Sequence, residues 1–171
     1  MKTGNQKQMN AYKAIDELRI LEDLRLYKPV LCGTIPIGID VESSDLDIIM
    51  EVKELKSFQQ KLYDLYGRQH RFTLEKKMIR ERQVVKANFM FKGFMFELFG
   101  QDQPVHNQNA YLHTLIEDEL LRKNPPLKNQ VITLKKRGYK TESAFCVLLG
   151  ISGDPYAGLI RYGIEEGIIK G

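Results

Sequence analysis

The sequence has only two cysteines and no run of about 18 apolar residues, and each shortage excludes a class of protein. Cys32 and Cys146 both lie in apolar stretches, VLCGT and AFCVLLG, which predicts buried free thiols rather than a disulfide framework or a zinc site. The first ten residues, MKTGNQKQMN, lack the apolar stretch of a signal peptide. We therefore expect a cytoplasmic protein of bacterial type that does not cross a membrane.

A strong excess of charge of one sign is also lacking. The chain carries 26 Lys and Arg against 22 Asp and Glu, which leaves a net charge of +4 over 171 residues. This mild basicity is compatible with an anionic ligand, but it is weaker than the clustered excess typical of nucleic-acid-binding proteins. With 43% hydrophobic residues, the chain has enough apolar material for a proper core.

Hydrophobic spacing divides the chain into a part with strands and a part that is all helical. Helices are predicted over 8–26, 54–66, 107–123, 127–137, 142–149 and 155–167, with Thr141 and Asp154 as N-caps of the last two. Strands are predicted over 29–33, 46–52, 71–79, 82–92 and 94–100, with a turn at Lys92-Gly93 and a loop over 34–44.

This order of elements indicates an α+β fold, a mixed β-sheet flanked by helices with a helical C-terminal extension. We expect residues 1–171 to form a single domain. In this interpretation about residues 1–103 make the α/β core, and about residues 104–171 make a helical part packed on it.

The stretch CGTIPIGIDVESSDLDI, residues 32–48, contains the first candidate site. Asp45 and Asp47 stand two residues apart at the start of a strand, so their side chains point to the same face, while Leu46 and Ile48 point toward the core. Adjacent carboxylates repel each other unless a cation or strong hydrogen bonds offset the charge. The pair is therefore either a metal site or a solvated end of a turn.

Glu97 is the only charged residue in the apolar strand FMFELFG, residues 94–100. A half-buried carboxylate on a central strand needs a partner, because an unpaired buried charge is costly. A metal ion shared with Asp45 and Asp47 would supply one, since hard divalent ions such as Mg²⁺ take carboxylate oxygens. A lysine or arginine is the alternative partner.

Together these residues resemble the signature of the polymerase-beta-like nucleotidyltransferase superfamily. That signature has a glycine and a small hydroxyl residue after the first strand, then Asp-x-Asp on the second strand and a carboxylate on a later one. Gly33-Thr34, Asp45-Leu46-Asp47 and Glu97 stand in this order, and Ser43-Ser44 matches the usual serine before the first aspartate.

More narrowly, the chain resembles a family of small bacterial proteins in that superfamily, which is described as a domain of unknown function. The matching stretches are GTIPIGIDVESSDLDI, FELFGQ, QNAYLHTLIE, LKKRGYKTESAF and GDPY. The sequence departs from the superfamily in having Thr34 for the usual serine and an apolar segment, Ile35-Pro36-Ile37, where many members have basic or polar residues.

The resemblance implies Mg²⁺- or Mn²⁺-dependent nucleotidyl transfer with two ions. Asp45, Asp47 and Glu97 would be the metal ligands and catalytic residues, with Glu97 on the acceptor side. Gly33, Thr34 and Ser44 would contact the phosphates of the nucleotide, because a glycine lets the backbone approach closely.

Other polar residues follow the third carboxylate and are candidates for contacts to the nucleotide or the acceptor. They are Gln101, His106, Gln108, Asn109 and His113. Either histidine is also compatible with a surface or packed position. The basic stretch 68–86 could steer a polyanion, or it could be a solvated sheet edge that lysines protect from aggregation.

Two hypotheses therefore stand. The first is a nucleotidyltransferase that moves a nucleoside monophosphate from a nucleoside triphosphate to a hydroxyl of an unknown acceptor. The second is a non-catalytic protein of the same fold that binds a nucleotide or a partner in a regulatory role. A nucleic-acid partner is possible but less favoured, and the sequence does not predict an oligomeric state.

Overall fold

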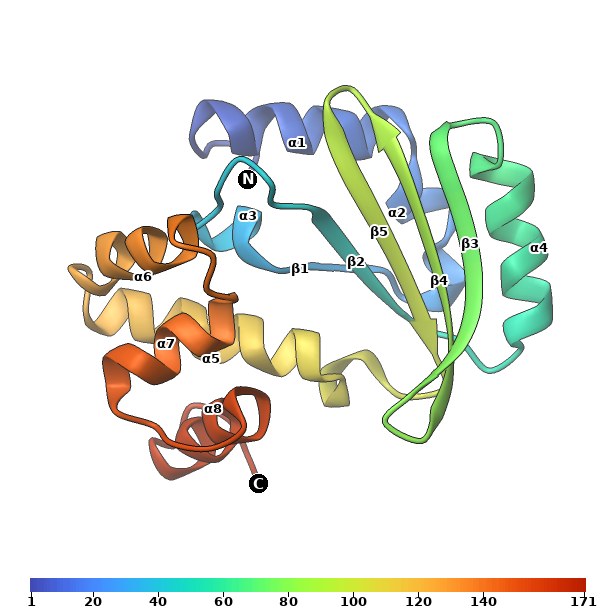
Figure 1. Cartoon of the computed structure of the whole chain (residues 1–171). Coiled ribbons are helices and arrows are strands. Elements are labelled where there is room, and N and C mark those ends of the chain that lie inside the picture. The colour runs from blue at the N-terminus through green and yellow to red at the C-terminus, as the bar shows by residue number, and fades with distance from the viewer. The chain divides into compact units, whose positions relative to one another are not determined.

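The computed structural model describes all 171 residues and divides the chain into two compact units (Figure 1). The sheet unit comprises Met1–Cys32 and Asp45–Gln108, and the helical unit comprises Gly33–Ser44 and Asn109–Gly171. The α+β fold class, with a mixed sheet and flanking helices, is confirmed. The grouping of segment 33–44 with the C-terminal helices was not foreseen.

The sheet unit is built on five strands in the order β1-β2-β5-β4-β3. Their bounds are β1 (Val30–Cys32), β2 (Leu46–Glu51), β3 (His70–Ile79), β4 (Arg82–Phe91) and β5 (Phe94–Gln101). Strands β2 and β5 are parallel and every other pair is antiparallel. The predicted mixed sheet is thus confirmed, with β1 and β3 at its two edges.

A tight turn at Lys92-Gly93 sets the register of β4 against β5. Both residues have positive φ, 47° and 80°, as the two-residue hairpin turns that match strand twist require. Pairing therefore starts with Phe91 opposite Phe94 and brings Asn88 opposite Glu97. This turn was predicted correctly from the sequence.

One face of the sheet forms a core with α4 (Leu55–Tyr66). The rings of Tyr66, Phe89 and Phe96 stack in series, with centroid separations of 5.0 and 5.1 Å. Gly100 lies under Phe58 of α4, which leaves no space for a side chain there. Leu46, Ile48, Phe96 and Leu98 are fully buried, so the alternate residues Asp47 and Glu97 lie on the opposite face of the sheet.

The N-terminal helix differs from the prediction. Residues 8–26 were expected to form one helix, but α1 (Gln6–Glu17) ends early, and α2 (Ile20–Asp23) and the 3₁₀ turn η1 (Arg25–Tyr27) follow. Arg19 breaks the helix because its backbone is left-handed, with φ 51°. The apolar residues beyond the break, Ile20 and Leu24, are still fully buried, which explains why their spacing imitated a continuous helix.

The helical unit consists of one short helix and four longer ones. Their bounds are α3 (Thr34–Ile37), α5 (Asn109–Lys123), α6 (Leu127–Lys136), α7 (Thr141–Leu149) and α8 (Pro155–Glu165). Its core contains Ile39, Ile116, Leu120, Leu121, Leu127, Val131, Ala144, Phe145, Cys146 and Leu159. The 3₁₀ turn η2 (Val105–Asn107) belongs to the sheet unit.

Two details of this unit correct the sequence prediction and one confirms it. Residues 34–44 are not all loop, because Thr34–Ile37 form a short helix that Gly38 ends with φ 73°. Thr141 is the first helical residue of α7 and Lys140 occupies the N-cap position. Asp154 does cap α8, where its Oδ2 accepts a hydrogen bond of 2.8 Å from the Ala157 N–H.

Candidate functional site

Two of the three predicted carboxylates lie side by side in the sheet unit. Asp47 of β2 and Glu97 of β5 are direct partners in the parallel register. Because paired residues of neighbouring strands project to the same face, both carboxylates lie on the face opposite α4. Both side chains are half-buried.

The third carboxylate, Asp45, lies one residue before β2. Its pKa is raised by partial burial and by the negative charge of Glu97, while Lys86 acts in the opposite direction. These effects place Asp45 within electrostatic range of both residues. In the sheet unit Asp47 and Glu97 are therefore register partners, and Asp45 lies within electrostatic range of Glu97.

A lysine that was not singled out as a site residue joins this group. Lys86 of β4 extends its Nζ to within 2.5 Å of Glu97 Oε2, and each side chain is 25% exposed. A lysine or arginine partner was the alternative considered for Glu97, without a position for it. The hairpin turn at Lys92-Gly93 was the sequence signal that could have identified it, since that turn sets which β4 residues flank Glu97.

The donor chemistry at Asp45 and Asp47 suits a hard divalent ion such as Mg²⁺ or Mn²⁺, because both residues supply carboxylate oxygens. No group of three or more His, Cys, Asp or Glu side chains is placed to hold a metal ion. The carboxylate of Glu97 is paired with Lys86. The number of bound ions stays a prediction.

The predicted phosphate-binding residues lie together in the helical unit. The hydroxyl of Thr34 donates to Ser44 Oγ over 3.1 Å, and Ser44 Oγ also accepts from the Val41 N–H over 2.9 Å. The Gly33 N–H donates to Thr114 Oγ1 of α5 over 3.0 Å. Gly33 has φ 81°, a value that favours glycine.

Three of the remaining candidates lie in the sheet unit. Gln101 ends β5, and its backbone carbonyl accepts from the Val52 N–H over 2.8 Å. His106 is exposed in η2. Gln108 is 1% exposed, and its Nε2 donates to the carbonyls of Met50 and Gln103 over 3.0 and 2.9 Å. Gln108 therefore ties the chain after η2 to the end of β2.

Asn109 and His113 lie in the helical unit, on α5. Asn109 is the first residue of the helix. His113 is 4% exposed, its Nε2 lies 3.0 Å from the Tyr156 carbonyl, and its Nδ1 lies 3.5 Å from Glu142 Oε1. Since a carbonyl only accepts, Nε2 carries a proton, and both ring nitrogens face acceptors. His113 thus joins α5 to α7 and α8.

The part of the basic stretch 68–86 that forms β3 lies along the exposed edge of the sheet, whereas Lys86 lies on the interior strand β4. Strand β3 is the edge strand, and its side chains from Glu75 to Ile79 are all exposed. Lys77 pairs with Glu75 over 3.1 Å, also at the surface. This geometry fits the solvated-edge interpretation, and binding of a polyanion stays a prediction.

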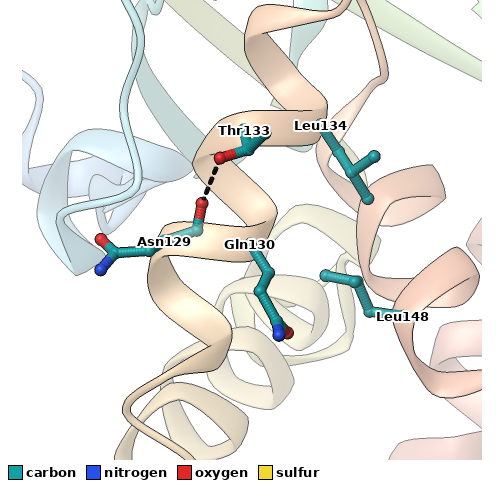
Figure 2. A pocket seen from close by; sticks show the side chains of 5 residues that line it. All are labelled: Asn129, Gln130, Thr133, Leu134 and Leu148. Atoms are coloured by element: carbon teal, nitrogen blue, oxygen red, sulfur yellow. Dashed lines mark hydrogen bonds between the residues drawn. The ribbon is translucent and has the colours of Figure 1, made fainter.

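A shallow hollow on the helical unit lies between α6 and α7 (Figure 2). It is lined by Asn129, Gln130, Thr133, Leu134 and Leu148. Thr133 Oγ1 donates back to the Asn129 carbonyl over 2.8 Å, so its hydroxyl is already engaged. The lining has no ionisable group, and none of the predicted site residues takes part.

The fold is similar to those of solved nucleotidyltransferases. One is the Cid1 poly(U) polymerase with MgGTP bound, which superposes with a TM-score of 0.55 at 17% identity over 77% of this chain and 42% of that chain. Another is a cytoplasmic RNA terminal U-transferase, with a TM-score of 0.54 at 17% identity over 77% of this chain and 40% of that one. Both comparisons support the nucleotidyltransferase-like fold.

This chain therefore spans less than half the length of these solved structures. No helix of the structure is both long enough and apolar enough to cross a bilayer. A search of the curated proteins found no match. A family model described as "Domain of unknown function (DUF4269)" matches residues 13–162, so the chain belongs to the DUF4269 family.

Proposed function

We propose that this protein is a metal-dependent nucleotidyltransferase that moves a nucleoside monophosphate from a nucleoside triphosphate to a hydroxyl group of an acceptor. The observation that carries the proposal is the parallel register of β2 and β5, which sets Asp47 beside Glu97. Asp45 lies within electrostatic range of Glu97. On a nucleotidyltransferase-like fold, this group of carboxylates fits a metal site for nucleotidyl transfer better than it fits the solvated end of a turn.

A divalent ion, Mg²⁺ or Mn²⁺, would neutralise phosphate charge and help to align the acceptor hydroxyl for in-line attack. In this proposal Asp45 and Asp47 hold the ion, and Gly33, Thr34 and Ser44 are the phosphate-binding candidates. Among the other candidates, exposed His106 is better placed to meet a ligand than buried Gln108 and His113, whose Nε2 atoms already donate to backbone carbonyls.

Calorimetric titration with Mn²⁺ and with each nucleoside triphosphate tests the proposal. We expect the wild-type protein to bind Mn²⁺, and to bind a triphosphate more tightly when Mn²⁺ is present. The double change Asp45→Asn with Asp47→Asn should abolish both effects, because amides cannot replace two anionic ligands of a hard cation. Transfer itself would be detected as release of pyrophosphate in the presence of hydroxyl-bearing acceptors.

Glu75→Gln is the matched control, since Glu75 is an exposed carboxylate of the same sheet that pairs with Lys77. It removes one negative charge without touching the carboxylate group of β2 and β5. Failure of the wild-type protein to bind Mn²⁺, or equal Mn²⁺ binding by the double variant, would contradict the proposal.

The ion pair between Lys86 and Glu97 favours a second candidate function. A carboxylate already neutralised by a lysine is less available to an acceptor-side ion, as expected of a non-catalytic nucleotidyltransferase-fold protein that binds a nucleotide. Nucleotide binding that persists in the Asp45→Asn, Asp47→Asn variant, with no pyrophosphate release by the wild type, would identify this second function.

A further inference from the structure

Lys86 and Glu97 form a lysine–carboxylate pair that is more enclosed than the pairs of Lys28 with Glu51, Lys77 with Glu75 and Lys92 with Glu17. The side chains of Lys86 and Glu97 are each 25% exposed. In the pair of Lys77 with Glu75 the corresponding values are 40% and 55%. Because water screens the Lys86–Glu97 pair less, its attraction is stronger than that of a surface pair.

The register of the sheet explains how Lys86 reaches Glu97. Lys86 lies opposite Phe99, and Glu97 lies opposite Asn88, so the two charged residues are diagonal neighbours on one face. A diagonal separation is within reach of a long side chain such as lysine. The ammonium group therefore approaches the carboxylate group from the β4 side, while Asp47 flanks Glu97 on the β2 side.

A second divalent ion at Glu97 would meet the ammonium group of Lys86, whose Nζ already lies 2.5 Å from Glu97 Oε2. A second ion would have to displace the ammonium group from Glu97 or bind beside it, and like charges at such short range repel strongly.

We infer that Lys86 takes the place of a second metal ion at Glu97, so that the carboxylates bind one divalent ion per chain at Asp45 and Asp47. This inference rests on the proposed function. It assigns Lys86 the role of a positioning residue: its ammonium group holds the Glu97 carboxylate and supplies the positive charge that a second ion would otherwise supply.

Counting bound Mn²⁺ ions tests the inference without any activity measurement. Mn²⁺ alone is titrated into the protein, and free Mn²⁺ is measured by electron paramagnetic resonance. We expect one bound ion for the wild type and two for Lys86→Met, which keeps the unbranched apolar part of the side chain but removes its charge. Lys86→Met combined with Glu97→Gln should return the count to one, because the second ion depends on the freed carboxylate.

Lys77→Met is the matched control. It removes the same charge from the same sheet but leaves the pair at Glu97 intact, so it should retain one ion. Thermal unfolding verifies that each variant is folded, and Lys86→Gln serves as a second variant if Lys86→Met is not. Two ions on the wild type, or one ion on both folded Lys86 variants, would overturn the inference.

These outcomes are distinguishable from failure of the proposed function. If the wild type binds no ion, both the proposed function and the role of Lys86 are wrong. If the wild type binds two ions that depend on Asp45 and Asp47, the metal site stands and only the role of Lys86 is wrong. If the ion counts are as expected but no nucleotide is bound or transferred, the role of Lys86 stands and the nucleotidyltransferase proposal fails.

Discussion

The sheet unit and the helical unit place their charged side chains in opposite environments. In the sheet unit the charged pair of Lys86 and Glu97 lies on one face of the sheet, where each side chain is 25% exposed. In the helical unit His113 and Glu117 are 4% and 3% exposed. Solvent, and therefore an ion, has access to the first group and is nearly excluded from the second.

The buried group of the helical unit is engaged in holding helices together. His113 contacts the Tyr156 carbonyl and the Glu142 carboxylate, and thereby joins α5 to the beginning of α8 and to α7. Lys135 of α6 donates to the Ile39 carbonyl over 2.9 Å. His113 is bonded to protein through both ring nitrogens, which is the usual state of a residue in a structural polar network.

This difference shows that polar residues in family motif stretches can have different roles, in ligand binding or in packing. Both Glu97 and His113 lie in motif stretches and both were candidate site residues. Their accessibility separates them, because a ligand can approach a quarter-exposed carboxylate and cannot approach an imidazole enclosed by three helices. We therefore expect substitution of His113 to change stability, and substitution of Lys86 or Glu97 to change ion binding.

The largest expected effect is that of His113→Phe. Phenylalanine keeps the ring volume but removes both polar contacts, and it leaves the Glu142 carboxylate without its partner. Removing one member of a buried ion pair costs roughly 3 to 5 kcal/mol. We expect a loss of unfolding free energy of about 3 kcal/mol, measured by urea denaturation with circular dichroism, and no change in the number of bound Mn²⁺ ions.

Two comparison variants make this result specific. Lys123→Met breaks an exposed pair with Glu119 on the same helix, 3.7 Å apart, and should cost less than about 0.5 kcal/mol. Lys86→Met in the sheet unit should cost on the order of 1 kcal/mol while changing the ion count. If Lys86→Met were as destabilising as His113→Phe, the proposed division between the two units would be wrong.

The second prediction addresses packing in the sheet unit. A Cβ atom at Gly100 would overlap the ring of Phe58 and come within 2.7 Å of Val52 Cγ2. Gly100→Ala should therefore destabilise the protein by about 1 to 3 kcal/mol, as overpacking usually does. The measurement is again the midpoint and slope of urea denaturation.

Phe58→Leu provides the control for that change. If the clash with the Phe58 ring is the cause, the double variant should be more stable than the sum of the two single changes predicts. Strict additivity of the two effects would show that Gly100 is required for another reason.

The sheet and its register were largely predictable from the sequence, because the physical rules involved are local. Alternation in 94–100 assigned Phe96 and Glu97 to opposite faces, and the turn at Lys92-Gly93 set the pairing of β4 with β5. The same register brings Lys86 within reach of Glu97. From the sequence, a basic partner for Glu97 was only the alternative to a metal ion.

Other features were not predictable because they depend on tertiary contacts. Arg19 adopts a left-handed conformation although nothing in its neighbourhood requires one, and the helix predicted over 8–26 is broken there. Segment 33–44 belongs to the helical unit although it follows β1 directly. The single-domain prediction and the site assignments at Gly33, Thr34, Ser44 and the polar candidates stay predictions.

The smallest expected effect concerns Glu117 and is best measured as a function of pH. Burial raises the pKa of Glu117 well above its ordinary value of 4.5, the charge of Glu142 raises it further, and Lys135 opposes both. The folded state thus holds this proton more tightly than the unfolded chain. Below pH 4.5 both states are protonated, and as the pH rises above 4.5 the unfolded chain releases its proton first, which lowers stability.

Glu117→Gln should remove that loss. We expect the variant to gain stability over the wild type as the pH rises above 4.5, and to show little difference in acid. Thermal unfolding at a series of pH values measures it.

Glu142 supplies the opposite case within the same unit. Burial acts to raise the pKa of Glu142, but the hydrogen bond and positive charge of His113 outweigh it and leave the pKa below 4.5. The stability that ionised Glu142 contributes is therefore present above pH 4.5 and is lost as the pH falls through the lowered pKa. Glu142→Gln should lower stability at neutral pH and reduce the loss of stability that the wild type shows as the pH falls below 4.5. Glu117→Gln should leave that acid part of the pH profile unchanged. If both variants shifted the pH profile in the same direction, the two carboxylates would not have the separate environments that the helical unit gives them.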